Sequence, residues 1–126
     1  MWKHPFCALF LSALIFLGIA GCSRSGSQPP APLALDQIPV EMNKAFAKAP
    51  VEAKQMVAQL IAGLEAKDYT IAYQTVQDLC NMSVATKDQR MVAVRSMFTI
   101  QGLLQTAQAQ GDQKAAAVLS EQRRLK

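Results

Sequence analysis

The feature that most constrains this 126-residue chain is an uncharged run near its N-terminus. From Phe6 to Ala20 no residue is charged, and Lys3 places a positive charge just before the run. These 15 residues are too few for a stable helix across a bilayer, which needs about 20 apolar residues. A positive start followed by an apolar run of this length is typical of a secretory signal peptide. We therefore expect residues 1–21 to be removed and to take no part in the fold.

Four residues at the end of this run, Ile19-Ala20-Gly21-Cys22, indicate how the segment is processed. Small residues let a peptidase approach the backbone closely, and the cysteine supplies a thiol that can form a thioether to a diacylglycerol. The stretch resembles the lipobox of bacterial lipoprotein precursors. That resemblance implies lipid transfer to the Cys22 sulfur, cleavage between Gly21 and Cys22, and acylation of the new amino terminus. An uncleaved membrane anchor is the alternative interpretation.

The same resemblance implies a location in the bacterial cell envelope. In such lipoproteins a serine after the lipidated cysteine, here Ser23, permits transfer to the outer membrane, whereas aspartate favours retention in the inner membrane. We expect the body to lie in the periplasm beneath an outer-membrane anchor, with the inner membrane and the cell surface as alternatives. Two or three acyl chains on Cys22 would hold the protein stably, because each buried CH₂ contributes about 0.8 kcal/mol.

A polar segment rich in serine and proline follows the cysteine. Residues 23–32 read Ser-Arg-Ser-Gly-Ser-Gln-Pro-Pro-Ala-Pro and contain nothing to bury. Serine and glycine make such a segment flexible, and prolines extend it. The sequence predicts a lipidated cysteine and flexible tether over residues 22–35, followed by one domain over residues 36–126.

The body has the composition and spacing of helices. Alanine and glutamine are abundant, β-branched runs are absent, and no proline follows Pro50. Apolar side chains recur at three- and four-residue intervals. The sequence predicts five helices, namely Pro39–Ala49, a second from Pro50 to about Lys67, a third after Asp68, a fourth from Thr86 to about Gln110, and a fifth after Asp112. Short connections make neighbours antiparallel, so we expect an all-α stack of helical hairpins.

Capping residues mark the ends of the predicted helices. Asp68 and Asp112 are expected N-caps, and Thr86 with Gln89 has the form of a capping box. Gly111 is a natural C-terminal stop. The apolar stripe of the fourth helix is broad: it is predicted to comprise Met91, Val94, Met97, Phe98, the polar Gln101 and Leu104. Ile100 and Leu103 widen it, so we expect this helix to pack on both sides.

Two of the predicted turns resemble the turn of a tetratricopeptide repeat. Residues 67–72, Lys-Asp-Tyr-Thr-Ile-Ala, and residues 111–116, Gly-Asp-Gln-Lys-Ala-Ala, follow the pattern Gly-Asp-x-x-x-Ala, in which alanine lets two helices approach closely. Lys67 replaces glycine in the first copy, and the copies lie 44 residues apart rather than 34. The likeness implies repeat-like hairpins with a peptide- or protein-binding surface, and no true repeat array.

The sequence contains no arrangement of residues typical of an enzyme. Without residues 1–21 no histidine remains, which excludes histidine-based triads and metal sites. Cys80 follows the apolar spacing of the third helix and is expected to be a small buried hydrophobe rather than a nucleophile. The carboxylates and glycines are scattered, so neither a calcium loop nor a phosphate loop is present. We expect no enzymatic activity, no cofactor and no metal.

A pair of aromatic residues is the strongest candidate for a binding face. Tyr69 and Tyr73 lie four residues apart in the third predicted helix, and Gln74 and Gln77 are nearby. These side chains could contact a ligand or peptidoglycan sugars, although packing between helices is the commoner use of this spacing.

The formal charge of +4 comes from the ends of the chain. Between Asp36 and Gln122 eight Lys or Arg face nine Asp or Glu, so the body gives no indication of nucleic-acid binding. The tail Arg123-Arg124-Leu125-Lys126 could contact anionic lipid or cell wall, but cations also complement the dipole at a helix C-terminus.

Together these patterns predict a non-catalytic, lipid-anchored envelope protein that binds another protein as an accessory or scaffold subunit. Its expected partners are the membrane, through Cys22, and an envelope protein. The alternative is a module that binds cell wall or a small ligand while anchored to the outer membrane.

Overall fold

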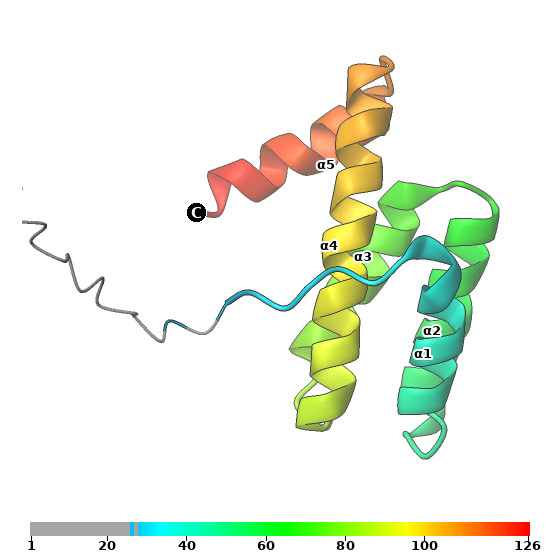
Figure 1. The fold of residues 1–126 in the computed structure, drawn as a ribbon. Coiled ribbons are helices and arrows are strands. Elements are labelled where there is room, and N and C mark those ends of the chain that lie inside the picture. Colours follow the sequence, from blue (N-terminus) through cyan, green and yellow to red (C-terminus); the bar gives the residue numbers. More distant parts are fainter. Residues whose placement is uncertain (1–25, 27) are drawn as a thin grey trace, which may run out of the picture.

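The fold is all-α, as the sequence predicts (Figure 1). The computed structural model describes Gly26 and residues 28–126, and this part of the chain contains no β-strand. Its elements are the short 3₁₀-helix η1 (Leu35–Gln37) and the helices α1 (Ile38–Ala45), α2 (Val51–Glu65), α3 (Tyr69–Asn81), α4 (Lys87–Ala109) and α5 (Gln113–Arg124). No helix in these residues is both long enough and apolar enough to span a bilayer. The lipobox residues Ile19, Ala20, Gly21 and Cys22 lie outside the described residues.

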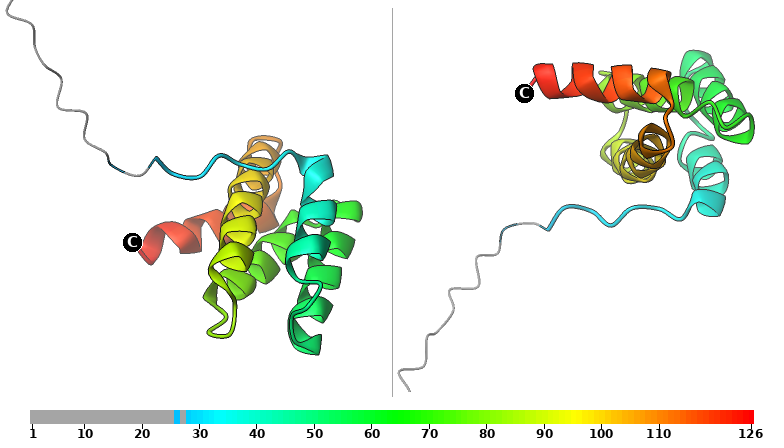
Figure 2. Two further views of the ribbon diagram at one scale, coloured as in Figure 1. Left: turned by 60° about the horizontal axis from the view of Figure 1, so that its bottom comes forward. Right: turned by 90° about the horizontal axis from the view of Figure 1, so that it is seen from above.

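Helices α1 to α4 alternate in direction and form an up-and-down array, and α5 follows α4 at a steep angle to it (Figure 1). Helix α2 packs on α3, α3 on α4 and α4 on α5, while α1 contacts both α2 and α4. The turns α2–α3 and α4–α5 therefore lie at one end of the array. Helix α5 diverges from the other helices (Figure 2). Its main contacts are with α4, and it also contacts α3.

The core lies between α1, α2, α3 and α4, and each helix contributes one apolar face. The largest fully buried hydrophobic side chains are Ile38, Met42, Phe46, Val57, Leu60, Tyr73, Val76, Leu79, Ile100 and Leu104. Helix α5 adds only Ala115 and Leu119 to the buried set. Because α5 buries so little, it depends on α4 for its position.

The first helix is shorter than the sequence predicts, since it ends at Ala45 rather than Ala49. Phe46 leaves the helical conformation with φ −97° and ψ 9°. Ala49 precedes Pro50, and the residue before a proline is disfavoured in the α conformation. Phe46 and Ala49 still reach the core from the loop, so the apolar spacing persists although the helix does not.

The buried face of α4 also differs from the predicted stripe. The residues of α4 that are buried are Gln89, Ala93, Ser96, Ile100 and Leu104. Met91 is 43% exposed, and Val94 and Phe98 are half-buried. The small residues Ala93 and Ser96 are fully buried because α1 and α3 both pack on α4 and approach its backbone closely. Of the predicted stripe, Leu104 is fully buried, whereas Met91 faces solvent and Val94 and Phe98 lie at the edge of the contact.

The predicted helix caps are confirmed. The Asp68 carboxylate accepts a hydrogen bond from the Ile71 amide at 3.1 Å. The Asp112 carboxylate accepts from the Lys114 and Ala115 amides at 2.9 and 3.1 Å. Thr86 and Gln89 form the reciprocal capping box at 3.2 and 2.9 Å. The Gln89 side-chain amide also donates to the Ala45 carbonyl at 3.1 Å, which joins the start of α4 to the end of α1.

The ordered body begins earlier than Asp36, because part of the predicted tether is attached to α4. We call residues 30–34 the strap. Arg95 Nε donates to the Ala31 carbonyl at 2.8 Å, the Leu33 amide donates to the Arg95 carbonyl at 3.3 Å, and the Thr99 hydroxyl donates to the Leu33 carbonyl. The Leu33 side chain is only 4% exposed. A single buried leucine among prolines has no periodicity, so the sequence pattern does not reveal it.

Candidate functional site

The turns α2–α3 and α4–α5 have matching backbone geometry. Lys67 and Gly111 both lie in the left-handed region, with φ of +56° and +94°. The Asp68 amide donates to the Gly63 carbonyl at 2.8 Å, and the Asp112 amide donates to the Ala107 carbonyl at 3.0 Å. These bonds close each preceding helix in a Schellman motif, and the same aspartate then caps the next helix. Lys67 therefore adopts the left-handed conformation that glycine usually adopts at this position of the turn.

A close approach of α2 to α3 fixes the first turn. A Cβ added at Gly63 would lie 3.2 Å from the Ala72 nitrogen and 3.4 Å from the Ala72 Cβ. Ala72 is fully buried, whereas Ile71, its neighbour, is 40% exposed. Two small residues therefore bring the helices together and set where α3 begins, and Tyr69 is its first residue.

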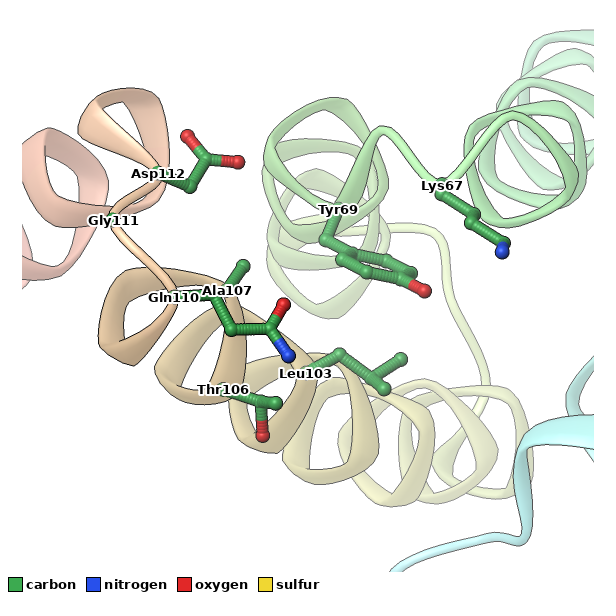
Figure 3. Close-up of a pocket in the computed structure, with 8 residues that line it drawn as sticks. All are labelled: Lys67, Tyr69, Leu103, Thr106, Ala107, Gln110, Gly111 and Asp112. Carbon is green, nitrogen blue, oxygen red and sulfur yellow. The ribbon is translucent and has the colours of Figure 1, made fainter.

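A hollow of about 640 Å³ lies between the two turns (Figure 3). Its lining comes from the α2–α3 turn, the last turns of α4 and the α4–α5 turn, and comprises Lys67, Tyr69, Leu103, Thr106, Ala107, Gln110, Gly111 and Asp112. A second hollow of about 230 Å³ shares Lys67, Tyr69 and Asp112 with the first. The Tyr69 ring thus contributes to the walls of both hollows.

The hollow has a half-buried apolar part and an exposed polar part. Tyr69, Leu103 and Ala107 are half-buried, while Lys67, Thr106, Gln110, Gly111 and Asp112 are exposed. The Asp112 carboxylate is engaged by the start of α5, and the Thr106 hydroxyl donates to the Gly102 carbonyl at 3.1 Å. Within the described part of the chain, the Lys67 ammonium and the Gln110 side-chain amide make no hydrogen bond or ion pair. They can therefore bond to an incoming group.

The structure separates the four residues of the predicted binding face. Tyr69 lines the hollow, but Tyr73 is 1% exposed and belongs to the core. Gln74 is exposed and Gln77 half-buried, and neither lines the hollow. The prediction of a common binding face is therefore wrong, and the alternative of packing between helices holds for Tyr73, which is buried with Gln122 of α5 beside it. Tyr69 is only half-buried because it is the first residue of α3.

Burial raises the pKa of Tyr73; the neighbouring Gln122 side chain opposes this rise, and Cys80 adds to it. The Tyr73 hydroxyl has no hydrogen-bond partner in the described residues, so Gln122 is close to it without bonding geometry. Burial likewise raises the pKa of the half-buried Cys80 thiol, which packs against the core. A thiol held protonated is a poor nucleophile. In the described range no three metal-ligating side chains gather.

Four of the eight residues that line the hollow are identified from the sequence, namely Lys67, Tyr69, Gly111 and Asp112. The other four, at the end of α4, are not identified from it as site residues. Lys67 and Gly111 were visible as turn residues, and the likeness of their two turns was the available signal. In an up-and-down array both of these turns lie at the same end, because the chain runs down α3 and back up α4 between them. The sequence around Leu103, Thr106 and Gln110 does not mark them as site residues. They line the hollow because α4 is long enough to place its last turns beside the α2–α3 turn.

Comparison with known proteins identifies no relative: no family model, no curated protein and no solved structure matches the chain. The function must therefore be inferred from the residues of the chain and their arrangement.

Proposed function

We propose that this protein is a lipid-anchored envelope subunit that binds another protein through the hollow between the α2–α3 and α4–α5 turns. The observation that carries the proposal is the hollow itself, with an apolar interior beside an exposed polar rim. Its volume of about 640 Å³ falls within the range of ligand sites, but such sites enclose most of their ligand. Five of the eight lining residues here are exposed, so the surface suits a protruding side chain or loop of a partner.

The chemistry of the lining indicates what a partner must present. Tyr69 offers a ring with an apolar face and a polar tip, and tyrosine is enriched among the residues that dominate binding energy. Leu103 and Ala107 extend this apolar area. Lys67 and Gln110 supply a cation and an amide at the rim. A partner loop with one apolar side chain and nearby carbonyl or carboxylate oxygens would satisfy both parts.

The anchor in this proposal is a lipid on Cys22, within the lipobox Ile19-Ala20-Gly21-Cys22, in the outer membrane. Intact-mass measurement of the protein purified from membranes tests it. We expect a mass lower by residues 1–21 and higher by a diacylglycerol and a fatty acid. Cys22→Ser should retain the uncleaved segment and lack the lipid, and an unchanged mass profile in that variant would contradict the anchor.

Site-specific photocrosslinking in intact cells tests partner binding. A photoreactive amino acid at Thr106 lies in the hollow, and one at Ala109 is a matched control on the same helix, exposed and outside the hollow. We expect a discrete crosslinked product from position 106 that is absent from position 109. The Thr106→Arg substitution should fill the hollow and abolish co-purification of that product, whereas Ala109→Arg should not. Equal crosslinking at both positions would refute the assignment of the hollow.

A second candidate, a cell-wall-binding module, is favoured by one detail of the same hollow. The half-buried Tyr69 lines the same hollow as the polar Thr106 and Gln110, and sugars are commonly held by an aromatic face with polar groups nearby. Sedimentation with purified peptidoglycan separates the candidates. Binding that Tyr69→Ala abolishes and Tyr69→Phe preserves would favour the wall, whereas no sedimentation together with a crosslinked protein would favour the accessory subunit.

A further inference from the structure

Charge is distributed unevenly between the two halves of the body. Over residues 35–81, which form η1 to α3, four Lys or Arg face six Asp or Glu, a side-chain charge of −2. Over residues 87–126, which form α4, α5 and the C-terminal end, seven Lys or Arg face three Asp or Glu, a side-chain charge of +4. A near-neutral total therefore conceals a cationic half and a mildly anionic half.

The cationic half is also where the N-terminal chain leaves the body. The strap and the C-terminal end of α5 extend to the same side of α4, away from α1 and α2 (Figures 1 and 2). Pro30 at the start of the strap shares a hollow of about 380 Å³ with Lys87, Arg90, Met91 and Val94 of α4. We call this side of α4, together with residues 123–126, the α4–α5 face.

The α4–α5 face combines cations with exposed apolar side chains. Met91 is partly exposed on α4, and Leu125 lies exposed between Arg124 and Lys126. Arg123 and Lys126 line a further small hollow against the glutamines of α4. The one ion pair here, Arg124 with Glu121 at 3.3 Å, is exposed on both sides and holds the arginine only weakly. Apolar side chains among cations are the chemistry of surfaces that lie on anionic bilayers.

The length of chain before the strap brings this face to the bilayer. Seven residues lie between Cys22 and Pro30, and the eight Cα-to-Cα steps that join the two span at most about 28 Å when fully extended. A flexible chain of this length spans on the order of 16 Å. Since the strap is bonded to Arg95 and Thr99, the chain emerges along α4 and not from the α1–α2 side. The face that bears the attachment point is thus the one nearest the membrane.

We infer that the α4–α5 face docks on anionic phospholipid headgroups of the membrane that holds the Cys22 lipid, so that the body lies on the bilayer in one orientation. This inference rests on the proposed anchor for its geometry, but its charge argument does not. Each Lys or Arg close to an anionic surface favours the docked state about fivefold. Neutralising Arg123, Arg124 and Lys126 should therefore weaken docking on the order of a hundredfold.

The test measures orientation with the lipidated protein reconstituted into vesicles. Cys80→Ala leaves no free thiol in the lipidated chain, and a fluorophore is then attached at Met91→Cys or, as the matched control, at Val51→Cys. Val51 is exposed at the start of α2, which packs on α1 and α3. Vesicles consist of phosphatidylcholine alone or mixed with phosphatidylglycerol, with nitroxide on the headgroups as quencher. Flotation of the vesicles reports anchoring separately.

We expect quenching of the Met91→Cys probe on vesicles with phosphatidylglycerol, and recovery in high salt or when residues 123, 124 and 126 are changed to Gln. The Val51→Cys probe should be unquenched throughout. Equal quenching of both probes, quenching without dependence on phosphatidylglycerol, or no quenching of the Met91→Cys probe would each overturn the inference. If the protein fails to float with phosphatidylcholine, the anchor is refuted. In that case, salt-sensitive flotation with vesicles that contain phosphatidylglycerol would still support docking of the α4–α5 face on anionic lipid. No flotation with those vesicles would overturn the docking inference.

Discussion

Substitution of Gly63 by alanine tests whether the α2–α3 contact fixes the first turn. An ideal Cβ at this position would meet the Ala72 nitrogen at 3.2 Å, the Ala72 Cβ at 3.4 Å and the Asp68 carbonyl oxygen at 3.4 Å. None of these atoms lies at the end of a flexible side chain, so α2 and α3 must separate by a few tenths of an ångström. Forced repacking of this kind costs about 1–3 kcal/mol.

The higher helix propensity of alanine opposes this loss of stability. The same substitution at Gly102 measures the size of the propensity gain. Gly102 also lies within a helix, but a Cβ there would meet nothing within 4 Å. Gly102→Ala should therefore raise the free energy of unfolding by about 1 kcal/mol. Gly63→Ala gains no more than this and loses the packing term, so we expect it to be neutral or to lower stability by up to about 2 kcal/mol.

Urea and thermal denaturation of the chain without residues 1–21, carrying Cys22→Ser, measure both effects. For a domain of this size 1 kcal/mol shifts Tm by about 4–8 °C, so the two alanine variants should move Tm in different directions or by clearly different amounts. If Gly63→Ala raised Tm as much as Gly102→Ala, the close approach to Ala72 would not constrain the turn. The contact between α2 and α3 would then not be what positions Tyr69 at the hollow.

Four further substitutions test the turns and the side chains of Tyr73 and Cys80. Lys67→Gly should raise the free energy of unfolding by about 1 kcal/mol, because the lysine occupies the left-handed region. Gly111→Ala should lower the free energy of unfolding by a similar amount, because alanine would then occupy that region. Urea titration measures both changes. Tyr73→Phe should raise stability by about 1 kcal/mol in the same assay, since it removes a buried hydroxyl without a partner, and a loss of stability would show that the hydroxyl is bonded. Burial raises the pKa of Cys80 above its ordinary 9.0, so the folded protein retains that proton when the unfolded chain has lost it. Stability should therefore fall as pH rises above about 9, and less steeply in Cys80→Ala; parallel pH profiles of the two proteins would contradict this cause.

Helix boundaries in this protein could be predicted from sequence because the signals that set them are local. Asp68, Thr86 and Asp112 each bond to an amide two or three residues ahead, so a few consecutive residues determine the cap. The same holds for Gly111, whose conformation ends α4. The end of α1 was mistaken because apolar spacing continues into the loop, where Phe46 is buried without being helical.

The positions of side chains relative to other helices could not be read in the same way. Apolar character suggests that Met91 and Val94 face the core, but close packing of helices favours the small Ala93 and Ser96 at the contact. The attachment of the strap likewise depends on partners more than 60 residues away, as in the bond from Arg95 to the Ala31 carbonyl. Only the tertiary arrangement brings such residues together.

The strap determines how the hollow would be presented to a partner. If the body hung from a tether that was flexible up to Asp36, it could rotate freely, and its two ends would be equivalent with respect to the membrane. Instead, the bonds of the strap to Arg95 and Thr99 fix the direction in which the chain leaves, along the side of α4. The hollow lies at the end of the helical array, where the two turns meet, and not on the α4–α5 face. A body docked on headgroups through that face would therefore leave the hollow open at its edge, so that a partner held at the same membrane could reach Tyr69 without displacing the protein from the lipid.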